Sequence, residues 1–375
     1  MRYVAIINLA VGIVMSALPT GAHAKTGIAL RFDYAGARAV LALLGTKNPT
    51  NAQINRVVAV RGARAMINNT IKYLPSNSLD GFASAVRQVA ATRKESTGDY
   101  QLDDVWAHRA EIQELIAALQ ANERPMVAAI VAKLLRYAPM AKDVTITAHF
   151  VAGGVSDGFL LDNDPKLEFF VALGKGDQDL PGLKLNITHE AFHAVQKALG
   201  KNHRRMAACV DDPNAGPPPV RLICTTLLEG TATFVADPTK SRAHGPYIDM
   251  WRSRYKRNLR RNALADAFTL FDQLLANLQD RSMTWKAAYA KAFTPPNTPA
   301  YFVGYEMART IARYDGPAAI GALFEAAPVD FFREYIRLYH SHPDLRFRFS
   351  SRTERFIESR SVKSGCPPCN LKNRL

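Results

Sequence analysis

The amino-acid sequence predicts a mainly α-helical fold of the α+β class, with a small antiparallel sheet or hairpin before a helix that carries two histidines. Apolar residues recur at three- and four-residue spacing over most of residues 34–139 and again over 247–359, which is the period of amphipathic helices. Between residues 143 and 174 they instead alternate or run together in short segments bounded by turn residues. We therefore expect helices on both sides of a short β segment.

The first 24 residues have the pattern of a secretory signal peptide. One early charge, Arg2, precedes an apolar run, and Ala22-His23-Ala24 supplies the small residues of a cleavage site, so the mature chain is expected to begin at Lys25. No later stretch reaches the length of about 18 apolar residues that a transmembrane helix needs. These features predict a periplasmic or secreted protein with no transmembrane segment in its mature chain.

Residues 25–142 are expected to form a helical N-terminal region. Helical periodicity is clearest in the segments 34–45, 54–74, 79–93 and 105–138, which are separated by glycine, proline and polar residues. The sequence leaves open whether this region is a propeptide, a lid or part of the core.

The β segment contains two candidate strands. Residues 144–154, VTITAHFVAGG, alternate like a strand, and residues 167–174, LEFFVALG, form a second β-rich run after a turn-rich connection. We expect the two runs to pair as an antiparallel hairpin. An edge strand beside the following helix could bind an extended peptide through main-chain hydrogen bonds.

The stretch from Leu185 to Gly200 contains the motif His189-Glu190-Ala191-Phe192-His193. On a helix of 3.6 residues per turn the two histidines lie at i and i+4 on one face, so their imidazoles can reach one point. A catalytic zinc ion needs two such neutral nitrogen ligands and a nearby base for a water whose pKa the metal lowers to roughly 7. The motif predicts one zinc ion bound by His189 and His193, with Glu190 as the base. The alternative is a buried helix whose histidines bond to neighbouring carbonyls.

A third ligand must come from another part of the chain. The extended pattern HExxHxxGxxH would need glycine where this sequence has Gln196 and histidine where it has Leu199. Glu229 is the strongest candidate, because it lies in a second apolar helical pattern, residues 225–237, after a proline-rich connection. Two antiparallel helices joined in this way can face each other, so that Glu229 completes a site of two His and one Glu. The alternative role for a Glu near a helix start is stabilisation of the helix dipole.

The sequence contains four cysteines, Cys209, Cys224, Cys366 and Cys369. In an exported protein disulfides are the default, and four cysteines allow three connectivities. Sequence proximity favours Cys209 with Cys224 and Cys366 with Cys369. The last pair forms a CxxC in a tail that lacks the βαβ setting of thioredoxin-like proteins, so a structural bridge is favoured over redox catalysis.

The segments HEAFH and LLEGTATFVAD together resemble the gluzincin metallopeptidases, and the chain is most similar to bacterial families of zinc-dependent peptidases whose function is unknown. The resemblance covers about residues 143 to 325. It implies a zincin-like catalytic core, with zinc bound by His189, His193 and Glu229 and with Glu190 as general base.

A later segment, YFVGYEMA from Tyr301 to Ala308, also matches those families, and the resemblance implies that Tyr301 or Tyr305 donates to the oxyanion. One position departs from the pattern. Many gluzincins place an Asp four residues after the ligand Glu to orient the first His, and here that position is Thr233. Asp237, His149 or a backbone carbonyl are the candidates to replace it.

Charge adds one further expectation. The chain has a formal net charge of +15, and residues 252–261, RSRYKRNLRR, are dense in positive charge. Such a surface favours anionic partners, such as an anionic component of the cell envelope. No DNA- or RNA-binding signature accompanies it, so a solvated helix face is the favoured interpretation and specific nucleic-acid binding is not expected.

The sequence as a whole predicts an exported zinc metallopeptidase. We expect the catalytic region at residues 143–346 and a C-terminal tail at 347–375 with the CxxC. The expected substrate is a peptide or protein. The alternative is a catalytically inactive zincin-fold protein that binds an anionic envelope partner.

Overall fold

The structure is a computed structural model that describes residues 27–174 and 178–360. The expected signal peptide and the Cys366–Cys369 pair lie outside the described residues. The first part of the chain alternates a little β structure with many helices, in the order β1 (Ile28–Asp33), α1 (Ala35–Leu44), α2 (Asn51–Ala59), α3 (Arg61–Tyr73), α4 (Leu79–Thr92), α5 (Leu102–Ala107), α6 (Arg109–Ala121), α7 (Glu123–Tyr137), β2 (Val144–Ala152), β3 (Gly158–Phe159) and β4 (Glu168–Leu173).

In its described residues, the second part contains helices and connecting loops but no strand. Its elements are α8 (Leu180–Gly200), α9 (Arg204–Asp211), α10 (Pro218–Val235), α11 (Pro246–Asn258), α12 (Arg261–Gln279), α13 (Trp285–Ala292), α14 (Pro299–Tyr314), α15 (Ala319–Ala322), the 3₁₀ helix η1 (Leu323–Glu325), α16 (Pro328–Ser341) and α17 (Ser351–Arg360). The mainly helical α+β class is therefore confirmed.

The sheet has four strands in the order β1-β2-β4-β3, and its pairing corrects the expected hairpin. β2 and β4 are parallel, with Thr147 opposite Glu168, and β1 is parallel to β2. The short strand β3 pairs antiparallel with β4 on its outer side. The prediction of a hairpin was wrong because the connection after β2 runs out to the far side of β4 before the chain returns in the direction of β2.

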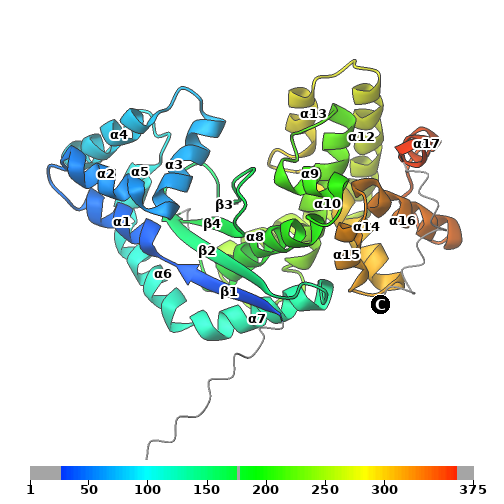
Figure 1. Cartoon of the computed structure of the whole chain (residues 1–375), viewed down its shortest axis with the longest axis horizontal. Coiled ribbons are helices and arrows are strands. Elements are labelled where there is room, and N and C mark those ends of the chain that lie inside the picture. Colours follow the sequence, from blue (N-terminus) through cyan, green and yellow to red (C-terminus); the bar gives the residue numbers. More distant parts are fainter. Residues whose placement is uncertain (1–26, 175–177, 361–375) are drawn as a thin grey trace, which may run out of the picture.

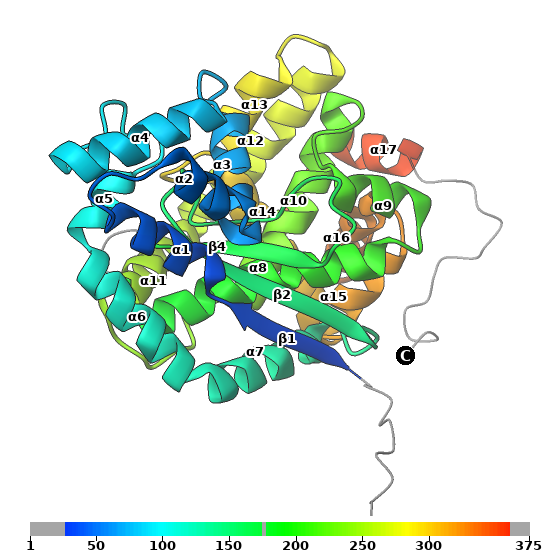
Figure 2. The same ribbon diagram turned by 60° about the vertical axis from the view of Figure 1, so that its left-hand side comes forward.

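Helices cover both faces of this sheet, as Figures 1 and 2 show. α1 and α3 pack on one face, and α7 and α8 pack on the other. Strands β2 and β4 are therefore buried on both faces, which explains why residues such as Phe169, Phe170 and Val171 read as a continuous apolar run. Because β1 belongs to the N-terminal region, that region and the β segment share one sheet.

The expected long helix over residues 105–138 is divided into α5, α6 and α7. Pro125 lies in the first turn of α7, one turn after the end of α6 at Ala121. Proline has no backbone N–H and its ring clashes with the carbonyl four residues earlier, so a continuous helix through this position is unfavourable. At the break the chain changes direction between α6 and α7 (Figure 2).

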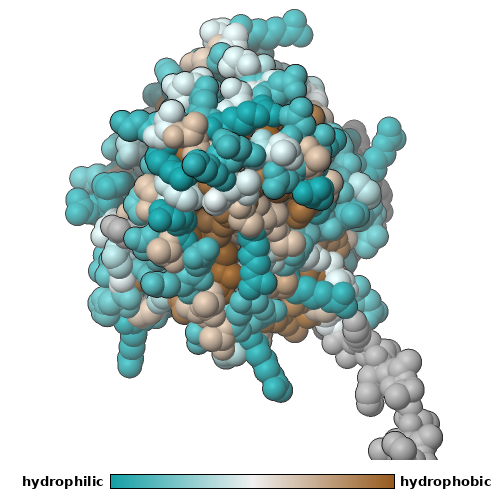
Figure 3. Space-filling model, turned by 90° about the vertical axis from the view of Figure 1, so that its left-hand side faces the viewer, coloured by the Kyte–Doolittle hydropathy of each residue, from teal (hydrophilic) through white to brown (hydrophobic). Residues whose placement is uncertain are grey.

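The N-terminal helices present a mostly polar surface. Figure 3 shows the face that lies at the left of Figure 1, where hydrophilic side chains surround a narrow area of hydrophobic ones. Among the residues that the structure describes, no helix combines the length and apolar character needed to cross a bilayer.

Candidate metal centre

Helix α8 carries the two histidines through the middle of the molecule. Asp179 caps its start by accepting a hydrogen bond from the N–H of Gly182 at 2.7 Å. The helix contacts strand β4 on one side and helices α7, α10 and α11 on others, so most of its residues are buried. The helix buries several polar side chains among its apolar ones. His189, Glu190 and His193 line one cavity.

Helix α10 brings Glu229 opposite the histidines. The expected Cys209–Cys224 disulfide is confirmed, and it ties α9, which follows α8, to the start of α10. On its other side α10 crosses α14 at two glycines. A Cβ on Gly230 would lie 2.3 Å from Cα of Gly304, and a Cβ on Gly304 would lie 2.3 Å from the carbonyl oxygen of Thr226. Only glycine at both positions permits this crossing, which brings α14 directly beside Glu229.

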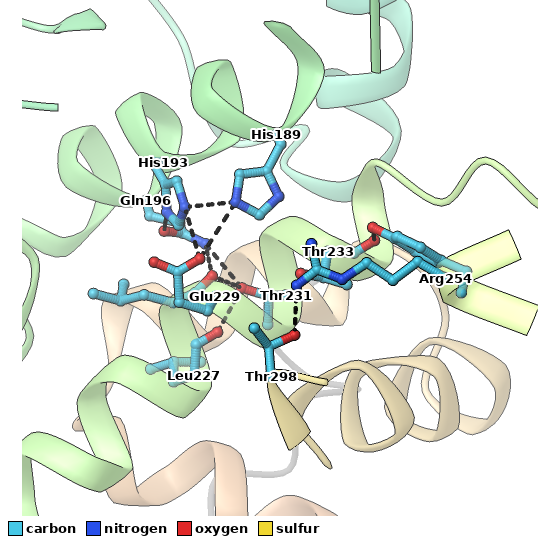
Figure 4. A network of polar contacts seen from close by, with 11 residues as sticks. His189, His193, Gln196, Leu227, Glu229, Thr231, Thr233, Arg254 and Thr298 are labelled. Carbon is cyan, nitrogen blue, oxygen red and sulfur yellow. Dashed lines mark hydrogen bonds and ion pairs between the residues drawn. The ribbon is translucent and has the colours of Figure 1, made fainter. Parts of the chain in front are cut away.

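The three candidate ligands converge on one point, as Figure 4 shows. Nε2 of His189 lies 3.1 Å from Nε2 of His193, and Oε2 of Glu229 lies 3.3 Å from the first and 3.5 Å from the second. A zinc ion about 2.0–2.1 Å from each ligand, in tetrahedral geometry, separates its ligand atoms by about 3.3 Å. The donor set and its spacing thus fit a zinc ion.

The side chains of the cluster stabilise one another's ionised forms. Burial alone would raise the pKa of the Glu229 carboxyl, but the two histidines hold that pKa far below its usual value. Burial would lower the pKa of His193, but Glu229, Glu190 and Gln196 together outweigh burial and raise this pKa to about 9. A carboxylate that faces two imidazoles can bind a metal ion in place of the protons on the imidazoles.

Gln196 fixes the orientation of His193, a role that sequence reasoning missed. Its side-chain N–H groups donate to the carbonyl of Leu228 and to Oγ1 of Thr231, both at 2.9 Å. Its Oε1 must therefore face His193, where it accepts from Nδ1 at 2.7 Å (Figure 4). With the proton on Nδ1, the lone pair of Nε2 points at the cluster. The signal in the sequence was the i+3 spacing from His193 on the same helix face.

We expect Gln196→Met to weaken zinc binding by about 10–100-fold, because a partner that orients a metal-binding His contributes roughly that much. Isothermal titration of the metal-free protein with zinc measures the effect. Gln120→Met is the matched control, since Gln120 is exposed on α6 and bonds to Arg38. An unchanged zinc affinity in a natively folded Gln196→Met variant would contradict this role.

The two candidate tyrosines have different surroundings. Tyr301 lines the cavity together with the cluster, and burial together with the adjacent Glu229 raises its pKa well above the usual value. Tyr305 lies one turn further along α14 and is turned away, because its hydroxyl donates to Asp237 at 2.8 Å. The structure therefore brings Tyr301 to the cluster and does not bring Tyr305 there.

The two side chains considered as replacements for the missing Asp also lie elsewhere. Asp237 accepts from Tyr305 and from the N–H of Thr239. His149, on β2, bonds through Nδ1 to Asp33 at 2.8 Å. Gln196, on the same helix, supports His193 only.

Glu190 lies at the junction of two cavities beside the cluster. One, of about 250 Å³, contains His193 and Glu229, and the other, of about 200 Å³, extends toward α11; both are lined by His189, Glu190, Gly158 and Tyr301. A Cβ on Gly158 would lie 2.5 Å from Oε1 of Glu190, so the strand β3 backbone passes directly over the carboxylate. Burial raises the pKa of Glu190, and the nearby histidines oppose that rise.

Two helices that supply His, His and Glu to one point, with a second Glu next to them, define a candidate zinc hydrolase centre. The chain matches over residues 54–344 a family described as "Putative zinc dependent peptidase (DUF5700)", and it belongs to that family. The match confirms the likeness to a zinc peptidase family of unknown function, and it begins within α2. No curated protein and no solved structure is similar enough to this chain to match it.

Proposed function

We propose that this protein is an exported zinc metallopeptidase of the gluzincin type. The observation that carries the proposal is the convergence of His189, His193 and Glu229 at the spacing of a tetrahedral zinc site, beside the buried carboxylate of Glu190. Membership of a zinc peptidase family supports it. Zinc bound there would polarise the scissile carbonyl and lower the pKa of a water molecule.

Glu190 is the proposed general base. Its carboxylate removes a proton from the attacking water as the bond to the carbonyl carbon forms, and the same proton then passes to the leaving amine as the C–N bond breaks. Burial raises the pKa of this carboxyl toward neutral pH. A pKa nearer the working pH suits a group that must both accept and return a proton.

Tyr301 is the proposed donor to the oxyanion. Its raised pKa keeps the phenol protonated at neutral pH, so the hydroxyl can donate a hydrogen bond to the oxygen that becomes negative in the transition state. Its place in the lining of both cavities, beside His189 and Glu190, supports this role.

The edge of β3 that faces away from β4 is the proposed binding site for a peptide substrate. This strand pairs with β4 on one side, and Gly158, Phe159, Leu160 and Leu161 line the cavity that contains the cluster. An extended peptide can add to such an edge through main-chain hydrogen bonds, which places its carbonyl groups next to Glu190.

Export is the remaining part of the proposal. The signal-peptide pattern of residues 1–24 and the Cys209–Cys224 disulfide support an oxidising compartment, the periplasm or the outside of the cell.

Metal analysis and peptide hydrolysis of the purified mature protein test the function together. We expect about one zinc per chain in protein purified without added zinc, hydrolysis of a mixed peptide library, loss of activity in chelator and its return with zinc. Protein that contains no zinc and does not bind added zinc would contradict the proposal. Zinc without turnover would favour the alternative, an inactive zinc protein that binds an anionic envelope partner.

A further inference from the structure

Arg254 differs from the other cations of the basic segment 252–261. The segment forms the end of α11 and the start of α12, and most of its lysines and arginines, including Lys256, Arg257 and Arg260, are exposed as expected for a solvated face. Arg254 is instead turned inward and lines the 200 Å³ cavity that adjoins the candidate metal centre. In Figure 4 its side chain extends from α11 toward the centre of the view, with the guanidinium beside Thr298.

Within residues 27–174 and 178–360, no carboxylate forms an ion pair with the guanidinium of Arg254. Its Nη2 donates to Oγ1 of Thr298 at 2.8 Å, and the group lies 4.9 Å from the ring centre of Trp251. Its Nε is buried and makes no hydrogen bond to any residue in 27–174 or 178–360. Asp157 lines the same cavity, but it is exposed and forms no ion pair with Arg254 among those residues. Burial lowers the pKa of the arginine, and the nearby Tyr301, Tyr255 and Asp157 offset only part of that decrease.

An inward guanidinium with free donors is a site for an anion. Arginine presents its N–H groups as a planar fork that fits the two oxygens of a carboxylate. A buried charge without a partner is costly, so binding a carboxylate there recovers an interaction that the free protein lacks.

The rest of the cavity defines what carries the carboxylate. Its walls are largely apolar, formed by Leu185, Ala236, Trp251, Tyr255, Phe293 and Phe302. A lining of this kind accepts an apolar side chain and disfavours a strongly hydrated polyanion. The other end of the same cavity is formed by His189, Glu190 and Tyr301. A group that fills the cavity can therefore belong to a substrate residue whose peptide bond lies at the metal centre.

We propose that Arg254 binds a carboxylate on the substrate residue at the leaving-group side of the scissile bond, while an apolar part of that residue fills the cavity. This inference rests on the proposed peptidase function and adds a substrate class to it. The carboxylate is either the C-terminal carboxylate of the peptide, in which case the protein removes single C-terminal residues, or the side chain of Asp or Glu within a longer chain. In both cases a carboxylate binds to the guanidinium of Arg254.

Binding to the zinc-loaded Glu190→Gln protein tests this without turnover. Calorimetric titration uses three peptides of identical upstream sequence, ending in phenylalanine with a free carboxylate, in phenylalanine amide or in glutamate amide. We expect the free acid to bind at least about 30-fold more tightly than the phenylalanine amide, the low end for a buried charge pair. Tight binding of the glutamate amide instead would assign the site to an acidic side chain.

Two further substitutions in the same background identify the residue. Arg254→Gln should remove the difference between acid and amide and leave the affinity for the amide within about threefold. Arg254→Lys keeps the charge without the fork and should retain part of the difference. Arg257→Gln, on the exposed side of the same helix, is the matched control and should change nothing. Zinc content reports that each variant is folded.

The outcomes separate this inference from the proposed function. Equal affinity for all three peptides, or equal loss for all three in Arg254→Gln, would overturn the carboxylate site. Hydrolysis by the zinc-loaded wild-type protein is measured with the same peptides. Tight Arg254-dependent binding of the free acid without hydrolysis would support the carboxylate site and contradict the peptidase function. Hydrolysis of all three peptides with equal affinity would support the peptidase function and contradict the carboxylate site.

Discussion

Replacing Glu190 by glutamine is expected to leave zinc in place and to lower kcat for peptide hydrolysis by about 10²–10⁴-fold, the contribution of a positioned general base. Glutamine has the same shape, so it fits under the Gly158 backbone where Oε1 now lies. It cannot accept the proton of the attacking water, whereas His189, His193 and Glu229 remain as they are. Zinc content by atomic absorption and initial rates on a cleavable peptide measure the two quantities on one preparation.

The matched control is Glu111→Gln, because Glu111 is an exposed residue of α6 far along the chain from the cluster. It should keep both zinc and activity. If Glu190→Gln retained the wild-type kcat with zinc bound, Glu190 would not be the base and the proposed mechanism would fail, although the metal site would stand.

Replacing Glu229 by alanine is expected to abolish stable zinc binding. Its carboxylate is the anionic member of the cluster and lies within 3.5 Å of both imidazole nitrogens. Loss of a direct ligand should cost more than the roughly 10–100-fold that loss of an orienting partner costs. The two histidines would then be the only ligands left of the three, so the remaining pair should hold the metal weakly.

Thermal unfolding with and without zinc gives a second measurement of the same change. A ligand that binds only the folded protein stabilises it by about 4 kcal/mol at 1,000 times its Kd. The wild-type Tm should therefore rise when zinc is added, and that of Glu229→Ala should not. Glu358→Ala, an exposed change on α17, should behave as the wild type. Stoichiometric zinc in Glu229→Ala would show that another residue provides the third ligand.

Local patterns were predicted well because they depend on neighbouring residues. The spacing of His189 and His193 gives a shared helix face whatever the rest of the fold, and α8 has the two side chains on one side. The helical character of residues 34–139 was likewise readable from periodicity. The disulfide between Cys209 and Cys224 followed from their closeness in sequence.

Strand pairing could not be read in the same way. The strand β1 pairs with β2 across more than one hundred residues, as in Ile28 opposite Val144, and a strand of six residues leaves no sign of its partner. The alternation in residues 144–154 shows that a strand is present but does not give the direction of its neighbour. The parallel order depends on how the connection through β3 passes β4.

The sequence by itself determined a helix with two histidines and a glutamate at metal-binding spacing, since helix geometry repeats every few residues. Only the tertiary structure decided that Glu229 meets them, that Tyr301 rather than Tyr305 joins them, and that Arg254 turns inward. These positions depend on the close crossing of α10 and α14 at Gly230 and Gly304 and on the packing of α11 against α8. Contacts between distant segments are set by the fit of whole surfaces, which no local spacing encodes.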